Sequence, residues 1–68
     1  MDISDSLKKR EIIIEFYPVG QLVKVTAMDT ATLTEVSIQG PMSAGEKTLK
    51  LNALKRLEYV LRKKGVIQ

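Results

Sequence analysis

Hydrophobic and polar residues alternate along three stretches of this chain and then change to a helical period. Residues 11–17 (EIIIEFY), 22–28 (LVKVTAM) and 34–39 (TEVSIQ) carry apolar side chains at every second position, which is typical of strands with one face on a core. Over residues 44–64 the apolar positions recur every three or four residues instead, which predicts an amphipathic helix. We therefore expect an α+β domain of order β-β-β-α, a three-stranded antiparallel meander with one C-terminal helix packed on one face.

The first turn, PVGQ, sets the register of the first two strands. A four-residue loop over 18–21 pairs Tyr17 with Leu22 and places Glu15 opposite Lys24, a favourable cross-strand pair. A slip by one residue would exchange the two faces of the strand. The hydrophobic pattern therefore favours the four-residue loop.

The second turn, DTATLT at residues 29–34, resembles the DDATKT loop in the second hairpin of a streptococcal immunoglobulin-binding domain. The resemblance implies that Asp29 pairs with Thr34. It also implies a positive φ at Leu33, which is costly for a leucine.

The expected helix carries a start signal and a stop signal. Ser43 and Glu46 have the S-x-x-E spacing of a capping box, and Gly65 follows a last turn of cations. The core is expected to combine the inner face of the strands with one stripe of the helix: Ile12, Ile14, Phe16, Val23, Val25, Ala27, Val36, Ile38, Leu49, Ala53, Leu54, Leu57, Val60 and Leu61.

Residues 1–10 have no clear period, so we expect a flexible N-terminal tail or a short helix, followed by a single domain over residues 11–68. An alternative is that this segment folds over the outer face of the sheet through Ile3 and Leu7.

Composition removes several classes of function. The chain has 68 residues and neither cysteine nor histidine, which argues against disulfides, zinc sites, histidine general bases and cysteine nucleophiles. No glycine lies in a phosphate-binding loop pattern. We expect a non-enzymatic protein without cofactor or metal. No apolar run approaches the about 20 residues of a membrane span, and the polar N-terminus has no signal-peptide core, so we expect a soluble, cytoplasmic protein.

The net charge of +3 is unevenly distributed. Residues 1–42 hold four basic and six acidic residues, a balance of −2, whereas residues 43–68 hold seven basic and two acidic residues, a balance of +5. A basic helix face with an aromatic residue could bind nucleic acid phosphates. Its candidate contacts, which the run Lys8-Lys9-Arg10 would supplement, are Lys47, Lys50, Lys55, Arg56, Tyr59, Arg62 and Lys63.

Four apolar residues point away from the helix: Ile13, Tyr17, Leu22 and Met28. A single helix covers one face of a sheet only, so these residues form a candidate protein interface. The first and third strands also have free edges, which invite pairing. Because a domain of this size is marginally stable alone, a homodimer through either feature would add stability.

The runs EFYPVGQLVKVTAMD, TEVSIQGP and LKRLEYVL resemble a small uncharacterised family from alphaproteobacteria, over residues 10–63. The resemblance implies no activity and no site residues. The family pattern has a glycine in the second turn where this chain has Leu33.

Three antiparallel strands and a basic helix are also similar to the C-terminal two thirds of a double-stranded-RNA-binding domain. That similarity implies phosphate contacts by Lys47 and Lys50, although residues 1–10 lack a counterpart of the family's first helix.

Two functions remain. The first is a small protein-interaction module, self-associating through the outer sheet face or an edge strand. The alternative is a nucleic-acid-binding module that uses the basic helix face.

Overall fold

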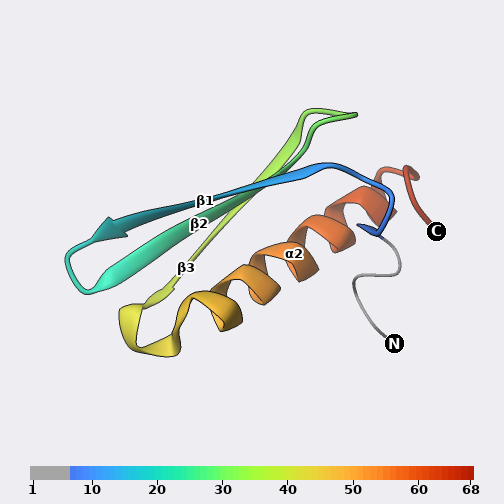
Figure 1. Cartoon of the computed structure of the whole chain (residues 1–68). Coiled ribbons are helices and arrows are strands. Elements are labelled where there is room, and N and C mark those ends of the chain that lie inside the picture. The colour runs from blue at the N-terminus through green and yellow to red at the C-terminus, as the bar shows by residue number, and fades with distance from the viewer. Residues whose placement is uncertain (1–6) are drawn as a thin grey trace.

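The computed structural model describes residues 7–68 and contains three strands followed by a C-terminal helix (Figure 1). The strands form an antiparallel sheet in the order β1-β2-β3. Their bounds are β1 (Ile12–Val19), β2 (Leu22–Asp29) and β3 (Thr34–Pro41). A 3-10 turn, η1 (Met42–Ala44), leads into helix α2 (Glu46–Lys63), which packs on one face of the sheet. The expected β-β-β-α fold is confirmed.

The first turn is tighter than expected. It consists of Gly20 and Gln21, and it pairs Val19 with Leu22. Gly20 has φ 62°, the left-handed conformation that two-residue hairpin turns require. The expected loop over residues 18–21, with Tyr17 opposite Leu22, is therefore wrong by two residues. An even shift keeps each side chain on its face, so the hydrophobic pattern cannot detect it.

The tighter turn changes the cross-strand partners on the outer face. Tyr17 lies opposite Lys24, and Glu15 lies opposite Thr26, so the expected pair of Glu15 with Lys24 is wrong. The Tyr17 hydroxyl instead donates a hydrogen bond to Glu15 Oε1 at 2.5 Å along the same strand. This bond from the phenol to the carboxylate raises the pKa of Tyr17.

The second turn agrees with the resemblance stated above. Asp29 lies opposite Thr34. Leu33 has φ 59° and is 73% exposed. The chain thus places a leucine in a conformation that favours glycine or asparagine, and the side chain gains no burial there.

The sequence predicted the C-terminal end of α2 correctly but not its N-terminal end. Gly45, with φ 86°, is the residue before the helix, and no side chain caps it. Ser43 lies within η1, so the expected capping box does not form. The reason is that η1 delays the start of the helix to Glu46, so that Gly45, two residues after Ser43, holds the N-cap position.

The C-terminal end of α2 follows the expected pattern. The N–H of Gly65, at φ 77°, donates to the Arg62 carbonyl oxygen at 3.0 Å. The N–H of Val66 donates to the Leu61 carbonyl oxygen at 2.9 Å. These two bonds form a Schellman motif, and Val66 packs on the core beside it.

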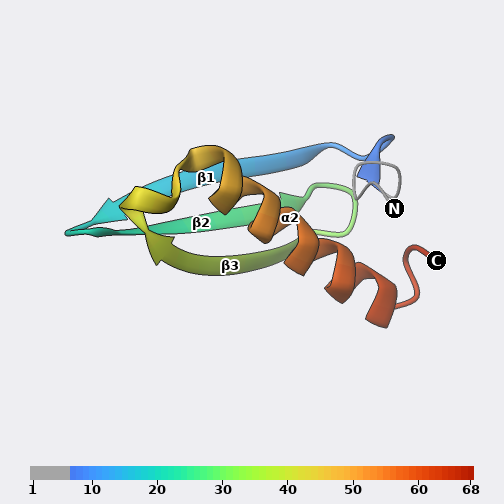
Figure 2. The same cartoon turned by 90° about the horizontal axis from the view of Figure 1, so that it is seen from below.

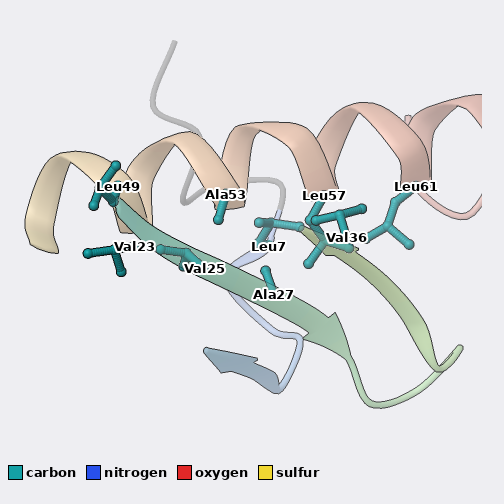
Figure 3. Close-up of a cluster of buried hydrophobic side chains, with 9 residues drawn as sticks. All are labelled: Leu7, Val23, Val25, Ala27, Val36, Leu49, Ala53, Leu57 and Leu61. Atoms are coloured by element: carbon teal, nitrogen blue, oxygen red, sulfur yellow. The ribbon is translucent and has the colours of Figure 1, made fainter. Parts of the chain in front are cut away.

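The core lies between α2 and the inner face of the sheet (Figure 3). Its buried apolar residues are Leu7, Val23, Val25, Ala27, Val36, Leu49, Ala53, Leu57 and Leu61. Eight of these nine are expected core positions, and the other six expected positions are partly buried against them: Ile12, Ile14, Phe16, Ile38, Leu54 and Val60. Leu7 is the exception. It joins the core under α2, so the alternative that it covers the outer face is wrong, while Ile3 lies outside the described residues.

Helix α2 packs mainly against β2 and β3, and it crosses the sheet obliquely, with its first turns in front of β1 in Figure 2. The inner-face residues of β1, in contrast, are only half-buried: Ile12, Ile14 and Phe16. One edge of the two-layer domain is therefore incompletely covered. No helix within residues 7–68 is long and apolar enough to cross a membrane.

Candidate protein-interaction surfaces

The four residues expected to form an outer-face interface are solvent-accessible but are not contiguous. Ile13, Tyr17 and Leu22 are exposed, and Met28 is half-buried. Ile13 lies opposite Met28 near one end of the sheet, whereas Leu22 lies near the hairpin end. The polar row of Glu15, Thr26 and Ser37 separates Ile13 and Met28 from Tyr17 and Leu22. The register therefore divides the expected interface into two small apolar patches.

The patch at the hairpin end is larger than the sequence indicated. Val19 is 67% exposed and lies opposite Leu22, and Pro41 lies on the other side of Leu22. The expected four-residue loop had removed Val19 from the strand. A two-residue turn at Gly20 and Gln21 would have placed Val19 in the strand and in this patch. The glycine at position 20 was the sequence signal for such a turn.

A different apolar surface lies between β1 and α2. One hollow of about 430 Å³ is lined by Ile12 and Ile14 of β1, Lys50 and Leu54 of α2, and Leu7, Lys8 and Arg10 of the segment before β1. A second hollow, of about 220 Å³, is lined by Lys47, Lys50, Leu51 and Leu54. The two share Lys50 and Leu54, and we refer to them together as the β1–α2 groove.

Helix periodicity explains why these residues meet. At about 100° per residue, Lys47, Lys50, Leu51 and Leu54 fall on the flank of α2 beside its buried stripe. Because α2 lies on β2 and β3, this flank is next to the uncovered inner face of β1. The sequence predicted Leu54 as a core residue and Lys47 and Lys50 as phosphate contacts, but it did not predict that they line a common groove.

The groove has a basic lining. Lys8, Lys47 and Lys50 line it, and no carboxylate is among its lining residues within the described part of the chain. The three lysines are exposed. The apolar floor is therefore bordered by positive charge along its length.

The fourth cation of the groove, Arg10, is engaged in an ion pair. Its Nε and Nη2 each donate to the Asp29 carboxylate at 2.9 Å. Asp29 is fully buried, while the Arg10 side chain is 21% exposed. Thr32 adds two hydrogen bonds to Asp29, from its hydroxyl at 2.7 Å and from its N–H at 3.2 Å. Arg10 is therefore a structural residue of the fold.

The bonds to Asp29 determine its ionisation. Hydrogen bonds from Arg10 lower the pKa of Asp29 to about 2. Burial opposes this shift, and the bonds from Thr32 support it. The pair connects the segment before β1 to the second turn, so it holds one end of the β1–α2 groove in place.

The opposite flank of α2 holds the aromatic residue of the predicted nucleic-acid surface. Arg56 and Lys63 lie 5.8 and 5.7 Å from the centroid of the Tyr59 ring. Arg62 forms an ion pair with Glu58 at 3.3 Å. Arg62 also donates to the Gln68 carbonyl oxygen, and Lys55 is exposed. Of the seven predicted contacts, Lys47 and Lys50 thus line the groove, and the other five lie outside it.

Within residues 7–68 no group of three or more acidic, histidine or cysteine side chains could hold a metal ion. A family model described as "Domain of unknown function (DUF6898)" matches residues 9–64. No curated protein and no solved structure matches the chain. The resemblance to an uncharacterised family is thereby confirmed. The similarity to double-stranded-RNA-binding domains stays a prediction.

Proposed function

The chain belongs to the DUF6898 family of domains of unknown function, and we propose that it is a small non-enzymatic protein-interaction module that self-associates through the free edge of β1. The observation that carries the proposal is that α2 packs mainly on β2 and β3 and leaves the inner-face residues of β1 only half-buried. This strand therefore combines an unpaired backbone edge with apolar side chains on both faces.

Strand composition favours β1 over the other edge, β3. The outward residues of β3 are polar: Glu35, Ser37 and Gln39. In β1, Ile13 is 44% exposed on the outer face, and Ile12 and Ile14 are half-buried on the inner face. Long apolar edges without lysine or an inward charge pair readily with another chain. Pro18, which lacks an N–H, limits the pairing to the residues before it.

A two-fold axis normal to the sheet would pair β1 with β1 of a second copy. Antiparallel pairing of this kind joins two sheets into one of six strands and keeps both copies of α2 on the same side. The contact is self-complementary, as a two-fold interface requires. The half-buried residues of β1 would become central in the joined sheet, which adds apolar burial to a thin core.

Sedimentation equilibrium tests the proposal, over about 1 µM to about 1 mM, a range that includes weak associations. We expect the average mass of the wild-type chain to rise from one chain toward two. Ile13→Lys places a charge on the pairing edge and is expected to weaken the association at least about tenfold, equivalent to about 1.4 kcal/mol. Ser37→Lys, the matched charge on β3, should leave it unchanged.

Two results would reject pairing through β1. One is a wild-type mass of a single chain over the whole range. The other is dissociation by Leu22→Glu or Tyr17→Asp but not by Ile13→Lys, which would assign the contact to the hairpin end of the outer face instead.

The nucleic-acid alternative has weaker support in the geometry. Its contacts are spread around α2, with Lys47 and Lys50 in the groove, and the Tyr59 ring already has Arg56 and Lys63 beside it. The Tyr59 ring therefore already makes cation–π contacts within its own chain, where a stacking base would have to bind. The observations therefore support protein association as the proposed function.

A further inference from the structure

We propose that the β1–α2 groove binds an amphipathic helix of a partner protein, one with a single apolar stripe and acidic residues along its flanks. The site is distinct from the backbone edge of β1, because it uses side chains of the inner face and of α2. It thus goes beyond self-association.

The dimensions of the two layers leave a place for such a helix. Strands lie about 4.8 Å apart, and packed helices lie about 8–10 Å apart. Figure 2 shows that α2 crosses the sheet obliquely, with its first turns in front of β1 and its last turns beyond β3, so it leaves open the part of β1 where the strand begins. A second helix beside α2 would lie over this part of β1 and its edge. The half-buried Ile12 and Ile14 form the floor beneath this position.

The side of the groove that α2 forms is long enough to hold a partner helix. Leu51 is 41% exposed and Leu54 is half-buried, and both line the groove from α2. From Lys47 to Leu54 the rise along α2 is about 10.5 Å, because each helical residue adds about 1.5 Å. A partner helix that runs along this wall can place apolar anchors against Leu51 and Leu54 and a carboxylate near Lys47.

Charge determines the class of partner. Lys8 lines one half of the groove, Lys47 lines the other, and Lys50 lines both. Among the described lining residues no acidic side chain neutralises them, and Arg10 is already paired with Asp29. Positive charge along the groove complements several carboxylates spread over a partner helix. A fatty acid, which has one charge at one end, would match only one half.

Titration with designed peptides tests the inference. The probe is a synthetic peptide of about four helical turns, with leucines on one stripe and glutamates on both sides. It is added to the isotope-labelled full chain while amide resonances are recorded. We expect shifts at the residues of the groove, notably Ile14, Lys50 and Leu54. A second peptide with lysines in place of the glutamates should bind at least about tenfold more weakly.

Charge-reversal variants provide the matched comparison. The double variant Lys47→Glu/Lys50→Glu should weaken binding of the acidic peptide at least about tenfold. The control, Lys55→Glu/Lys63→Glu, makes the same change in net charge outside the groove. It should alter the affinity for the peptide by less than about twofold, because salt screens exposed charges that do not contact the peptide. Leu51→Glu tests the apolar wall at an exposed position that tolerates substitution.

Several outcomes would overturn the inference. Equal losses in the two double variants would show non-specific attraction to a basic protein. Tighter binding of oleate than of the peptide, with shifts at the groove, would assign it to a lipid-like anion. Shifts on dilution of the chain alone at Lys50 and Leu54 of α2, which the edge contact of β1 does not involve, would assign the groove to a second copy. The Ile13→Lys variant separates the two proposals, because it should lose self-association and still bind the acidic peptide.

Discussion

Leu33 is a strained residue in an otherwise regular hairpin. Its φ of 59° lies in the left-handed region, and no other non-glycine residue of the described chain has a positive φ. The side chain is 73% exposed, so no packing compensates for the conformation. For a residue with a Cβ atom this conformation costs roughly 1–2 kcal/mol.

Relief of this strain should stabilise the protein. Leu33→Asn is expected to raise the free energy of unfolding by about 0.5–1 kcal/mol, because asparagine tolerates the left-handed region. Urea denaturation monitored by circular dichroism measures the change. Ala31→Asn, in the same turn but without a positive φ, is the control and should give no gain. Equal effects of the two substitutions would contradict the strain at Leu33.

Asp29 is the residue whose role depends most on pH. Its pKa is about 2 in the folded protein, and the ordinary value is 3.8. A lowered folded pKa means that the unfolded chain takes up a proton first as the pH falls. The stability contributed by Asp29 is therefore complete above about pH 5 and is lost progressively as the pH falls through the range from 3.8 to about 2.

Asp29→Asn should remove this contribution. At pH 7 we expect a loss of about 2–3 kcal/mol, because the ion pair is broken and one partner remains. The difference between the variant and the wild type should shrink as the pH falls toward 2. Denaturation curves recorded from pH 7 to pH 2 give both results, with Glu46→Gln, a change at an exposed helix residue, as control. A difference that stays constant with pH would contradict the ion pair.

At the scale of elements, the contact between β3 and α2 depends on a missing side chain. Gly40 lies in β3 opposite Val23, and a Cβ atom added there would collide with the Leu49 side chain of α2. Leu49 is buried and packs in the core, so it has little space to move. Gly40 therefore allows the start of α2 to approach the sheet closely.

Gly40→Ala tests this close approach. We expect it to lower the free energy of unfolding by about 1–3 kcal/mol, as overpacking of a core does. In the double variant Gly40→Ala/Leu49→Ala the loss should be smaller than the sum of the single losses, since the collision is gone. Additive losses in thermal or urea unfolding would show that Gly40 does not limit the helix position.

The same scale explains what the hydrophobic pattern could and could not predict. The alternation correctly assigned the inner and outer faces of all three strands. It failed at the turn between β1 and β2, because a shift by two residues leaves every face unchanged. At the second turn, where the local chemistry of residues 29–34 specifies the loop, the predicted register is confirmed.

At the scale of the whole molecule, the domain has a thin core and one incompletely covered edge. The buried apolar residues lie between α2 and strands β2 and β3. If β1 associates as we propose, the midpoint temperature of unfolding should rise with protein concentration, because only folded chains associate. Ile13→Lys should remove that dependence, which links the mass measurements to stability.

The candidate surfaces also become intelligible only at this scale. The individual residues were correctly expected to be accessible, as Ile13, Tyr17 and Leu22 are. Their division into two groups was not expected, because it follows from the register, which places a polar row between Ile13 and Tyr17. The groove was missed altogether. Its lining comes from three segments of the chain, and only the lateral position of α2 brings them together.

The sequence by itself determined the order of the elements, the face of each strand residue, the buried stripe of α2 and its C-terminal stop at Gly65. These properties follow from periodicity and from the local chemistry of turns and caps, which act within a few residues. Only the tertiary structure decided the β1–β2 register, the burial of Asp29 with Arg10 and the placement of α2 over β2 and β3. The reason is that these features depend on which distant side chains fit together, and no local period encodes that fit.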